Sequence, residues 1–512
     1  MRTLTKAIFS RALECEIGMA TVPVLSKSRF LAGLQCPLRL WYLCFEPGFA
    51  SAPSPFQRAL FDAGRRVGEL ARERYPGGVL IREDYLHHED GMRSTREALN
   101  NSRISAIYEG AFTFDGVRIR TDILERSVHE SWNLIEVKSG TSVKDENLYD
   151  VAVQYHVLRG LGFEVEKAGI LYVNNEYRYD GQRLDLEALF AFRDLKEEVV
   201  EIQGEIGERL RDLKAMLVQA TRPTIQPSRH CRKPYICEFF EHCRKGLPDH
   251  WVLELSGIRQ DQLAELAMLG IVGIRDIPES FNLSMIQARI RECVITGSEY
   301  VGKDLGAILR QYEHPIHFLD FETFAPAIPR YAGTHPYQTL PFLWSNHILS
   351  EDGSLAHEAH ICDADKDPRE EIARTLLASV GDRGTICTYA TLETQVISDL
   401  AEHLPQYGEP LQGLLSRCRD LHADIRRDYY HPEFDGSFSI KTVLPVLVPS
   451  MSYAGLSVQD GGQAGMEYVR MIEPETPSEE RERIRRALLE YCGQDTLAMV
   501  RIREELLRRS DK

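Results

Sequence analysis

The 512-residue sequence has no run of apolar residues that approaches the roughly 20 needed to cross a bilayer. Its first residues also lack the long apolar core and the small-residue cleavage site of a secretory signal. We therefore expect a cytoplasmic protein with no membrane partner. Residues 1–22 are predicted to be an N-terminal extension, and Met19 within it is an alternative start.

The sequence also has no excess of basic residues: it contains 61 Lys and Arg and 77 Asp and Glu, which give a formal net charge of −16. This balance argues against a uniformly basic nucleic-acid coat, although a local basic groove can still bind phosphates. Carboxylates that hold cations would also contribute formal negative charge. The sequence has no Walker-type phosphate loop, no internal repeat and no low-complexity segment.

The cysteines number 11, and disulfides are disfavoured in a chain without a secretory signal. Cys231, Cys237 and Cys243 are evenly spaced, with five residues between neighbours, and Cys36 lies far upstream. Four thiolates can hold a tetrahedral zinc ion or a cubane iron–sulfur cluster, and the spacing alone leaves both open. The other cysteines, including Cys492, are interpreted as buried or free thiols.

The order of periodic segments predicts an α/β protein. Short alternating runs between 104 and 138 indicate strands, and a helix is expected near 147–161. Segment 190–218 is predicted to be one long charged helix. Residues 251–310 are expected to be helical, and a second mixture of strands and helices begins at Pro315.

A first group of acidic residues lies on the strands predicted between 104 and 138. Glu136 and Lys138 are two residues apart, so they project from one face of a strand, and Asp122 lies on the strand before. Glu109 is a further candidate carboxylate. Two carboxylates and an amine suit metal-assisted phosphodiester hydrolysis, because carboxylates bind Mg²⁺ and a lysine can stabilise developing negative charge. The alternative is a solvated strand face.

A second group combines a D-x-E pair on a strand with acids further along the chain. Asp320 and Glu322 share one strand face, and Glu393 follows a later strand. Tyr491 and Asp495 lie four apart on a predicted helix and so share a face. Four converging carboxylates could hold two Mg²⁺ ions that clamp the attacking and leaving oxygens of a phosphodiester.

The first group resembles the RecB-like PD-(D/E)XK nuclease superfamily, which has a restriction-endonuclease-like fold. Asp122, the triplet from Glu136 to Lys138, and Gln154 on the following helix carry the resemblance. It implies that these residues are catalytic and that Asp122 and Glu136 bind Mg²⁺ or Mn²⁺. An upstream helix supplies a further metal ligand in such enzymes, and Glu69 is the corresponding candidate.

One cysteine before this region and three after it resemble the iron–sulfur nucleases of the RecB and CRISPR-adaptation type. The resemblance favours a 4Fe–4S cluster over zinc. It implies that the cluster is a structural staple held by four ligands: Cys36, Cys231, Cys237 and Cys243.

The second group resembles the tyrosine-containing branch of the DEDD exonucleases, which have an RNase H-like fold. The resemblance implies that Asp320, Glu322 and Asp495 bind metal, and that Glu393 and Tyr491 complete the catalytic set. Because the family usually has Asp where this chain has Glu393, Asp420 is a reserve candidate for the third acid.

The whole order resembles a bacterial family classed by a domain of unknown function. It implies a RecB-like PD-(D/E)XK nuclease over 23–248, a helical, helix-hairpin-helix-like linker over 249–312 and an RNase H-like exonuclease over 313–512. We expect a DNA-directed nuclease of repair, recombination or defence, with 3′–5′ trimming at the second site and a helicase as a separate partner. The alternatives are a nucleic-acid-binding scaffold with decayed sites and an RNA-processing exonuclease.

Overall fold

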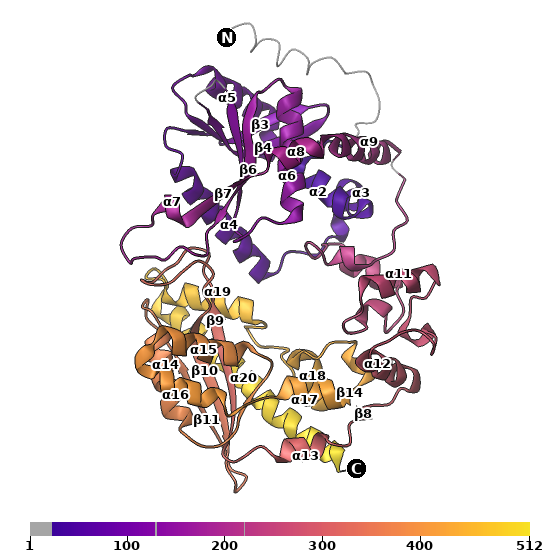
Figure 1. The fold of residues 1–512 in the computed structure, drawn as a ribbon, viewed down its shortest axis with the longest axis vertical. Helices are drawn as coiled ribbons and strands as arrows, with labels where there is room; N and C mark the ends of the chain where they lie inside the picture. Colours follow the sequence, from indigo (N-terminus) through magenta and orange to yellow (C-terminus); the bar gives the residue numbers. More distant parts are fainter. Residues whose placement is uncertain (1–22, 128–130, 220, 512) are drawn as a thin grey trace. The chain divides into compact units, whose positions relative to one another are not determined.

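The computed structural model describes residues 23–127, 131–219 and 221–511 as a mixed α/β protein (Figure 1). The predicted extension 1–22 lies outside the described residues. The chain divides into two compact units. Unit 1 comprises residues up to Lys245 together with Pro326–Tyr337, and unit 2 comprises Gly246–Ala325 and Gln338–Lys512. The predicted linker 249–312 is therefore part of unit 2.

Unit 1 is built on a seven-stranded sheet in the order β2-β3-β4-β5-β6-β7, with β1 beside β4. Strands β3, β4 and β5 are antiparallel neighbours, whereas β5 and β6 run parallel and α6 connects them. The strands are β1 (Leu25–Ser26), β2 (Val79–Leu80), β3 (Ala106–Phe114), β4 (Val117–Arg126), β5 (Trp132–Lys138), β6 (Val165–Val173) and β7 (Phe190–Asp194).

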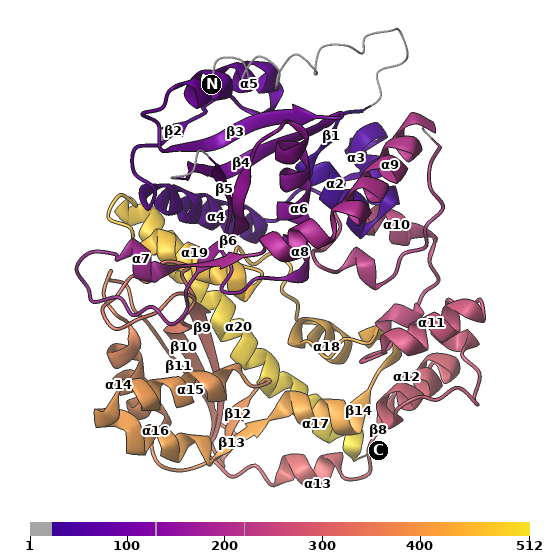
Figure 2. The same cartoon turned by 45° about the horizontal axis from the view of Figure 1, so that its top comes forward.

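Two hydrophobic clusters cover the two faces of this sheet. On one face, Leu124 and Leu134 pack with apolar side chains of α6 and α9. On the other face, Ile123 and Ile135 pack with α4, and Figure 2 shows α4 and α6 on opposite sides of the sheet. The helices are α2 (Lys27–Gln35), α3 (Pro37–Phe45), α4 (Pro55–Glu73), α5 (His88–Asn100), α6 (Asp145–Gly160), α7 (Leu186–Leu189), α8 (Lys196–Glu201), α9 (Gln203–Gln219) and α10 (Phe240–Cys243).

The prediction of one long helix over 190–218 was wrong at its start. Residues Phe190–Asp194 form edge strand β7, which pairs antiparallel with β6, and two helices follow. Phe190 is buried in the α4 side of the core, so tertiary packing overrides the helical pattern of the segment. The same core holds Ala327, which explains why Pro326–Tyr337 belongs to unit 1.

Unit 2 begins with short helices, as predicted, and continues into a five-stranded sheet in the order β11-β10-β9-β12-β13. Strands β11, β10 and β9 are antiparallel, whereas β12 and β13 are parallel to β9. The strands are β8 (Tyr300–Val301), β9 (Ile316–Phe324), β10 (Leu340–Leu349), β11 (Leu355–Ile361), β12 (Ile386–Thr388), β13 (Cys418–Asp420) and β14 (Tyr429–Tyr430).

Side-chain alternation along the central strand β9 separates a core face from a polar face. Leu319 and Phe321 join the hydrophobic core formed with α14 and α15, whereas Asp320 and Glu322 face the side where α19 and α20 contact the sheet. The helices are α11 (Gln260–Met268), α12 (Met285–Thr296), α13 (Leu305–Arg310), α14 (Arg369–Val380), α15 (Leu392–His403), α16 (Gly408–Leu415), α17 (Leu421–Asp428), α18 (Ile440–Leu447), α19 (Gly461–Ile472) and α20 (Ser478–Ser510).

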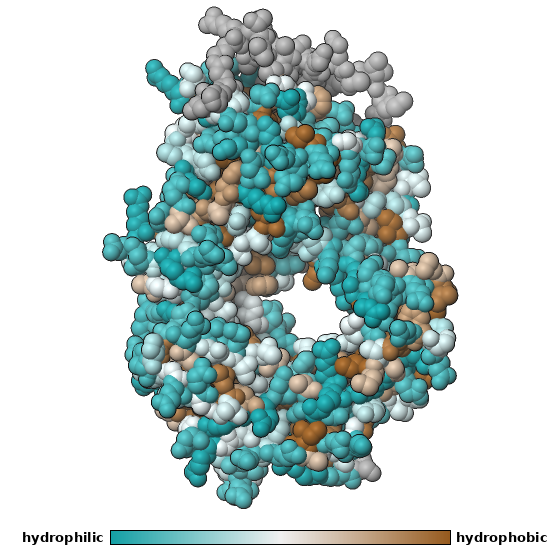
Figure 3. Space-filling model, in the orientation of Figure 1, coloured by the Kyte–Doolittle hydropathy of each residue, from teal (hydrophilic) through white to brown (hydrophobic). Residues whose placement is uncertain are grey.

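No helix of the described residues is both long enough and apolar enough to span a bilayer. The surface in Figure 3 is mostly hydrophilic, with brown side chains gathered over the region of α11. Met268 and Leu269, at the end of α11, are 83% and 57% exposed. The chain turns there at Gly270, whose φ of +71° favours glycine.

Gly384 is predicted to be indispensable for the packing of β12. Its φ is +83°, and a Cβ built there would lie 1.9 Å from the carbonyl oxygen of Pro315. We expect Gly384→Ala to lower the free energy of unfolding by more than about 2 kcal/mol, from backbone strain and steric conflict. Gly413→Ala is the matched control, because nothing lies within 4 Å of a Cβ on that helical glycine. Denaturant unfolding measures both, and an equal effect of the two changes would contradict this packing.

Candidate active sites

The first acidic cluster, defined as Asp122, Glu136 and Asp150 with Lys27 and Lys138, lies on the α6 face of the unit 1 sheet. Asp122 comes from β4, and Glu136 and Lys138 come from β5. Asp150 is on α6, and Lys27 is the first residue of α2. The hydroxyl of Ser26 caps α2 by accepting a hydrogen bond from the backbone N–H of Arg29 at 3.3 Å, so the helix begins at Lys27.

Two ammonium groups join two of these carboxylates. Lys27 Nζ donates to both carboxylate oxygens of Glu136 at 2.9 Å and lies 3.3 Å from Asp150 Oδ1. Lys138 Nζ lies 2.8 Å from Glu136 Oε1 and 2.5 Å from Asp150 Oδ2. Gln154 donates to Glu136 Oε2 at 2.8 Å. The cluster is thus a network of charge-assisted hydrogen bonds.

The third carboxylate in the first cluster has a different environment. Burial, followed by the charge of Glu136, raises the pKa of Asp122 to about 7. Burial alone would raise the pKa of Glu136 as well, but the ammonium groups of Lys138 and Lys27 hold it well below its usual range. Asp122 accepts a hydrogen bond from the Val137 backbone N–H at 2.8 Å, and no lysine donates to it among the described contacts. In this cluster, a bound cation would therefore offset the unfavourable burial and charge repulsion of Asp122 more than those of the other two carboxylates.

Glu69 is not part of this network. It lies on α4, which packs on the opposite face of the sheet, and its exposed side chain pairs with Arg66 at 3.1 Å. The prediction that it completes a metal site therefore lacks support from its position. Glu109 lies next to Asp122, and its charge contributes to the raised pKa of that residue. Its φ of +57° is unusual for a residue inside a strand.

The four predicted cluster-binding cysteines converge in unit 1. Cys36, between α2 and α3, lines one cavity together with Cys231, Cys237 and Cys243. Burial raises the pKa of the Cys231 thiol, and burial with the charge of Glu238 raises that of Cys237 to about 11.

Hydrogen bonds tie together the two chain segments that carry these cysteines. Gln35 donates to the carbonyl oxygens of His230 and Tyr235 at 2.6 and 2.8 Å, and Arg39 donates to Glu238 at 2.8 Å. Thiols that are buried and tied in this way can ligate a metal once they lose their protons.

The second acidic cluster, defined as Asp320, Glu322, Glu393 and Asp495, lies at the polar face of β9 in unit 2. Asp320 and Glu322 come from β9, Glu393 from the first turn of α15, and Asp495 from α20. Strand β10 has an irregular register between Pro341 and Leu343, opposite Glu322. Such bulges re-aim side chains and are common next to active sites.

Carboxylates outnumber nearby cations in the second cluster, and the pKa values reflect this. Burial and the charges of Asp495, Glu322 and Glu393 raise the pKa of Asp320 well above its usual value. Burial raises the pKa of Glu393 to about 7 and that of Asp495 to about 6. The Oε2 atom of Glu393 is buried with no hydrogen-bond partner among the described residues. A buried carboxylate oxygen that has no hydrogen-bond partner and is surrounded by other carboxylates is suited to bind a cation.

Two tyrosines and a lysine from other parts of unit 2 complete this second cluster. Tyr453 donates a 2.5 Å hydrogen bond to Asp495 Oδ1, and the predicted Tyr491 also hydrogen bonds to Asp495. Lys441 Nζ lies 5.0 Å from the ring centroid of Tyr491 and lowers the pKa of Glu322 and Asp495. Tyr453 lies 42 positions before Asp495 in the sequence, so local spacing does not connect the two residues.

Cys492 was interpreted from sequence as a buried or free thiol, and the structure has it buried and unpaired with any other cysteine of the described residues, at the edge of the second acidic cluster. Its Sγ lies 3.3 Å from Asp320 Oδ2, and these two residues form a possible metal-binding group with Glu322. The charge of the reserve candidate Asp420 contributes to the raised pKa of Glu393, and Asp420 also makes structural contacts. It caps α17 through the N–H of Ala423 and also accepts from the N–H of Ala390 at 2.9 Å. Ala390 has a φ of +78°, so this bond supports a strained turn.

Comparison with known proteins finds a match to a family model within unit 2. Residues 317–439 match a family described as Domain of unknown function (DUF2779). The matched segment includes Asp320, Glu322 and Glu393, and it agrees with the predicted resemblance to a family classed by a domain of unknown function. No curated protein is similar enough to the chain to match it.

The raised pKa of Glu393 predicts a loss of stability as the pH rises. Because its pKa is about 7 in the folded chain against a usual value of 4.5, the folded state binds its proton more tightly. This stabilisation is complete below about pH 4.5 and is lost as the pH rises through about 7. With divalent cations chelated, Glu393→Gln should therefore become more stable than the parent by up to about 3 kcal/mol between pH 5 and 8.

The measurement for Glu393 is thermal unfolding across this pH range. Glu402→Gln removes an exposed carboxylate from the same helix and is the matched control. If the difference in unfolding temperature between the parent and Glu393→Gln does not change with pH, the Glu393 carboxylate is not held in a repulsive environment.

Proposed function

We propose that the chain is a metal-dependent nuclease with two acidic active sites, one in each unit. The observation that carries the proposal is the convergence of Asp320, Glu322, Glu393 and Asp495, whose pKa values are all raised above their usual range. Protein folding does not favour such a group without a compensating cation. Perturbed carboxylates in one site are also a general mark of function.

In the second cluster, Asp320, Glu322 and Asp495 would hold Mg²⁺ or Mn²⁺. These ions would polarise a phosphodiester and lower the pKa of a water molecule. Tyr453 and Tyr491 orient Asp495 through hydrogen bonds. Lys441 carries the positive charge that suits a phosphate oxygen. These roles support the RNase H-like, DEDD-type assignment of unit 2 and trimming from a 3′ end.

In the first cluster, Asp122 and Glu136 would hold the ion, and Lys138 would stabilise negative charge on the phosphate. Gln154 fixes the orientation of the Glu136 carboxylate. The position of these residues at the β4–β5 hairpin and on the following helix supports the PD-(D/E)XK assignment of unit 1. We propose DNA as the preferred substrate, a role in repair, recombination or defence, and any helicase as a separate partner.

The four cysteines would hold a 4Fe–4S cluster that ties α2 and α3 to the segment around α10. Zinc sites usually pair cysteines with two to four residues between the ligands, whereas five residues separate Cys231 from Cys237 and Cys237 from Cys243. The wider spacing in sequence supports a cubane cluster held by four thiolates.

Removing one of these cysteines should remove the iron. We expect the protein purified without oxygen to contain iron and sulfide in about equal amounts, near four of each per chain. Cys231→Ser should lose most of both, whereas Cys44→Ser, which lies outside the cavity, should keep them. Iron, sulfide and zinc analysis measures this. Stoichiometric zinc without iron in the parent would overturn the iron–sulfur assignment.

Each acidic cluster should account for its own cleavage products. With Mg²⁺ or Mn²⁺ and end-labelled DNA or RNA, Lys138→Ala and Asp320→Asn should each remove a different set of products. The expected loss in rate is at least about 100-fold, the scale of losing one group that stabilises transition-state charge. A time course resolved on a gel gives both the rates and the preferred substrate.

Matched controls for this assay come from exposed positions in the same units. Lys167→Ala on β6 and Asp352→Asn in the β10–β11 turn should leave both sets of products unchanged. If the parent cleaves nothing with either metal but still binds nucleic acid, the chain is a binding scaffold and the nuclease proposal fails.

A further inference from the structure

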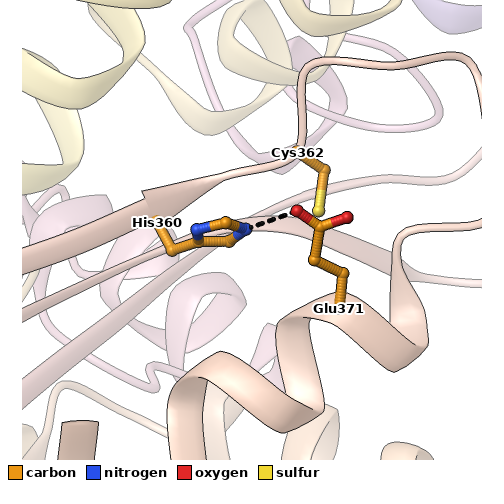
Figure 4. A group of neighbouring side chains, drawn as sticks. All are labelled: His360, Cys362 and Glu371. Carbon is orange, nitrogen blue, oxygen red and sulfur yellow. Dashed lines mark hydrogen bonds and ion pairs between the residues drawn. The ribbon is translucent and has the colours of Figure 1, made fainter. Parts of the chain in front are cut away.

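A third group of metal-ligating side chains lies in unit 2, between the edge strand β11 and helix α14. It consists of His360 on β11, Cys362 just after that strand and Glu371 on α14 (Figure 4). One ligand atom from each lies within 4.8 Å of the other two. The imidazole Nε2 of His360 is 3.0 Å from Glu371 Oε1.

The ligand atoms that these three side chains offer favour some metal ions over others. An imidazole nitrogen, a thiolate sulfur and a carboxylate oxygen are the three ligand types that Zn²⁺ takes in proteins. Mg²⁺ and Ca²⁺ prefer oxygen ligands alone, so a thiolate disfavours them. Three protein ligands leave a fourth tetrahedral position for water.

The surroundings suit an ion that enters from solvent. The side chains of His360 and Glu371 are 28% and 25% exposed, whereas Cys362 is fully buried in the core. The second carboxylate oxygen of Glu371 is held by Lys366 at 2.7 Å. Contacts of this kind orient the first ligands of metal sites.

The buried thiol explains how binding would couple to protonation. Burial, with the charge of Glu371, raises the pKa of Cys362 to about 12, so it carries its proton at neutral pH. Zinc ligation would release that proton to solvent, with the sulfur electron pair forming the Zn–S bond. The hydrogen bond between His360 and Glu371 would be replaced by bonds to the ion.

We propose that His360, Cys362 and Glu371 bind one zinc ion, which ties β11 to α14 and closes the 362–368 connection. This site shares no residue with either acidic cluster or with the four cysteines, so it does not depend on the proposed nuclease activity. Binding to the folded chain alone would stabilise the fold.

Zinc content of the full chain tests the proposal. The protein is purified without oxygen, incubated with ZnCl₂ and desalted, and zinc and iron are measured by elemental analysis. We expect His360→Ala and Cys362→Ser each to hold one zinc ion fewer per chain than the parent. Whatever occupies the four-cysteine cavity or the acidic clusters is the same in parent and variants and cancels from this difference.

The matched control is His357→Ala, which removes another imidazole from β11. His357 Nε2 contacts Ser345 Oγ at 2.9 Å and does not belong to the group. It should bind as much zinc as the parent. Added zinc should also raise the unfolding temperature of the parent and of His357→Ala by the same amount, and that of His360→Ala by less.

Equal zinc content in the parent and His360→Ala, with an equal thermal response to zinc, would overturn the site. If Cys362→Ser fails to fold, the half-buried Glu371→Gln replaces it, because this change keeps the size of the side chain. The same loss of one zinc ion is expected from it.

Discussion

Repulsion between buried carboxylates is the interaction on which both acidic sites depend. In unit 1 the chain supplies part of the compensation itself, since Lys27 and Lys138 bridge Glu136 and Asp150. In unit 2, Lys441 is the ammonium group that lowers the pKa values of Glu322 and Asp495, two of the four carboxylates. The second cluster therefore has the larger deficit of positive charge. Divalent cations are the simplest way to offset it, and a phosphodiester substrate needs the same cations.

Much of the site geometry could be predicted because it follows from local periodicity. Two-residue spacing on a strand places Asp320 and Glu322 on one face of the sheet. Because Leu319 and Phe321 are buried in the hydrophobic core on one face, the two carboxylates must lie on the opposite face. Four-residue spacing on α20 likewise places Tyr491 beside Asp495. The mixed α/β class followed from the alternation of helical and extended patterns, and the structure confirms it.

The residues that sequence reasoning missed depend on contacts across the chain. Lys27 reaches Glu136 from 109 positions away, and Tyr453 reaches Asp495 from 42 positions away. Asp150 could have been predicted to join the first cluster, because it lies one turn before Gln154 on the same helix. Cys492 looks like a core thiol in sequence, and only the fold brings it to Asp320. The position of Glu69 on the opposite side of the sheet could not be predicted, because an amphipathic pattern does not reveal which face of a sheet a helix covers.

Manganese binding tests the central claim most directly, because it does not require the right substrate. Equilibrium dialysis of the full chain with Mn²⁺, at about pH 8 and about pH 5, compares the parent with Glu322→Gln. The account predicts binding at the higher pH, loss of binding as the carboxylates take up protons, and fewer bound ions in the variant. If parent and variant bind the same number of ions at the higher pH, the second acidic cluster is not a cation site and the proposed chemistry of unit 2 is wrong.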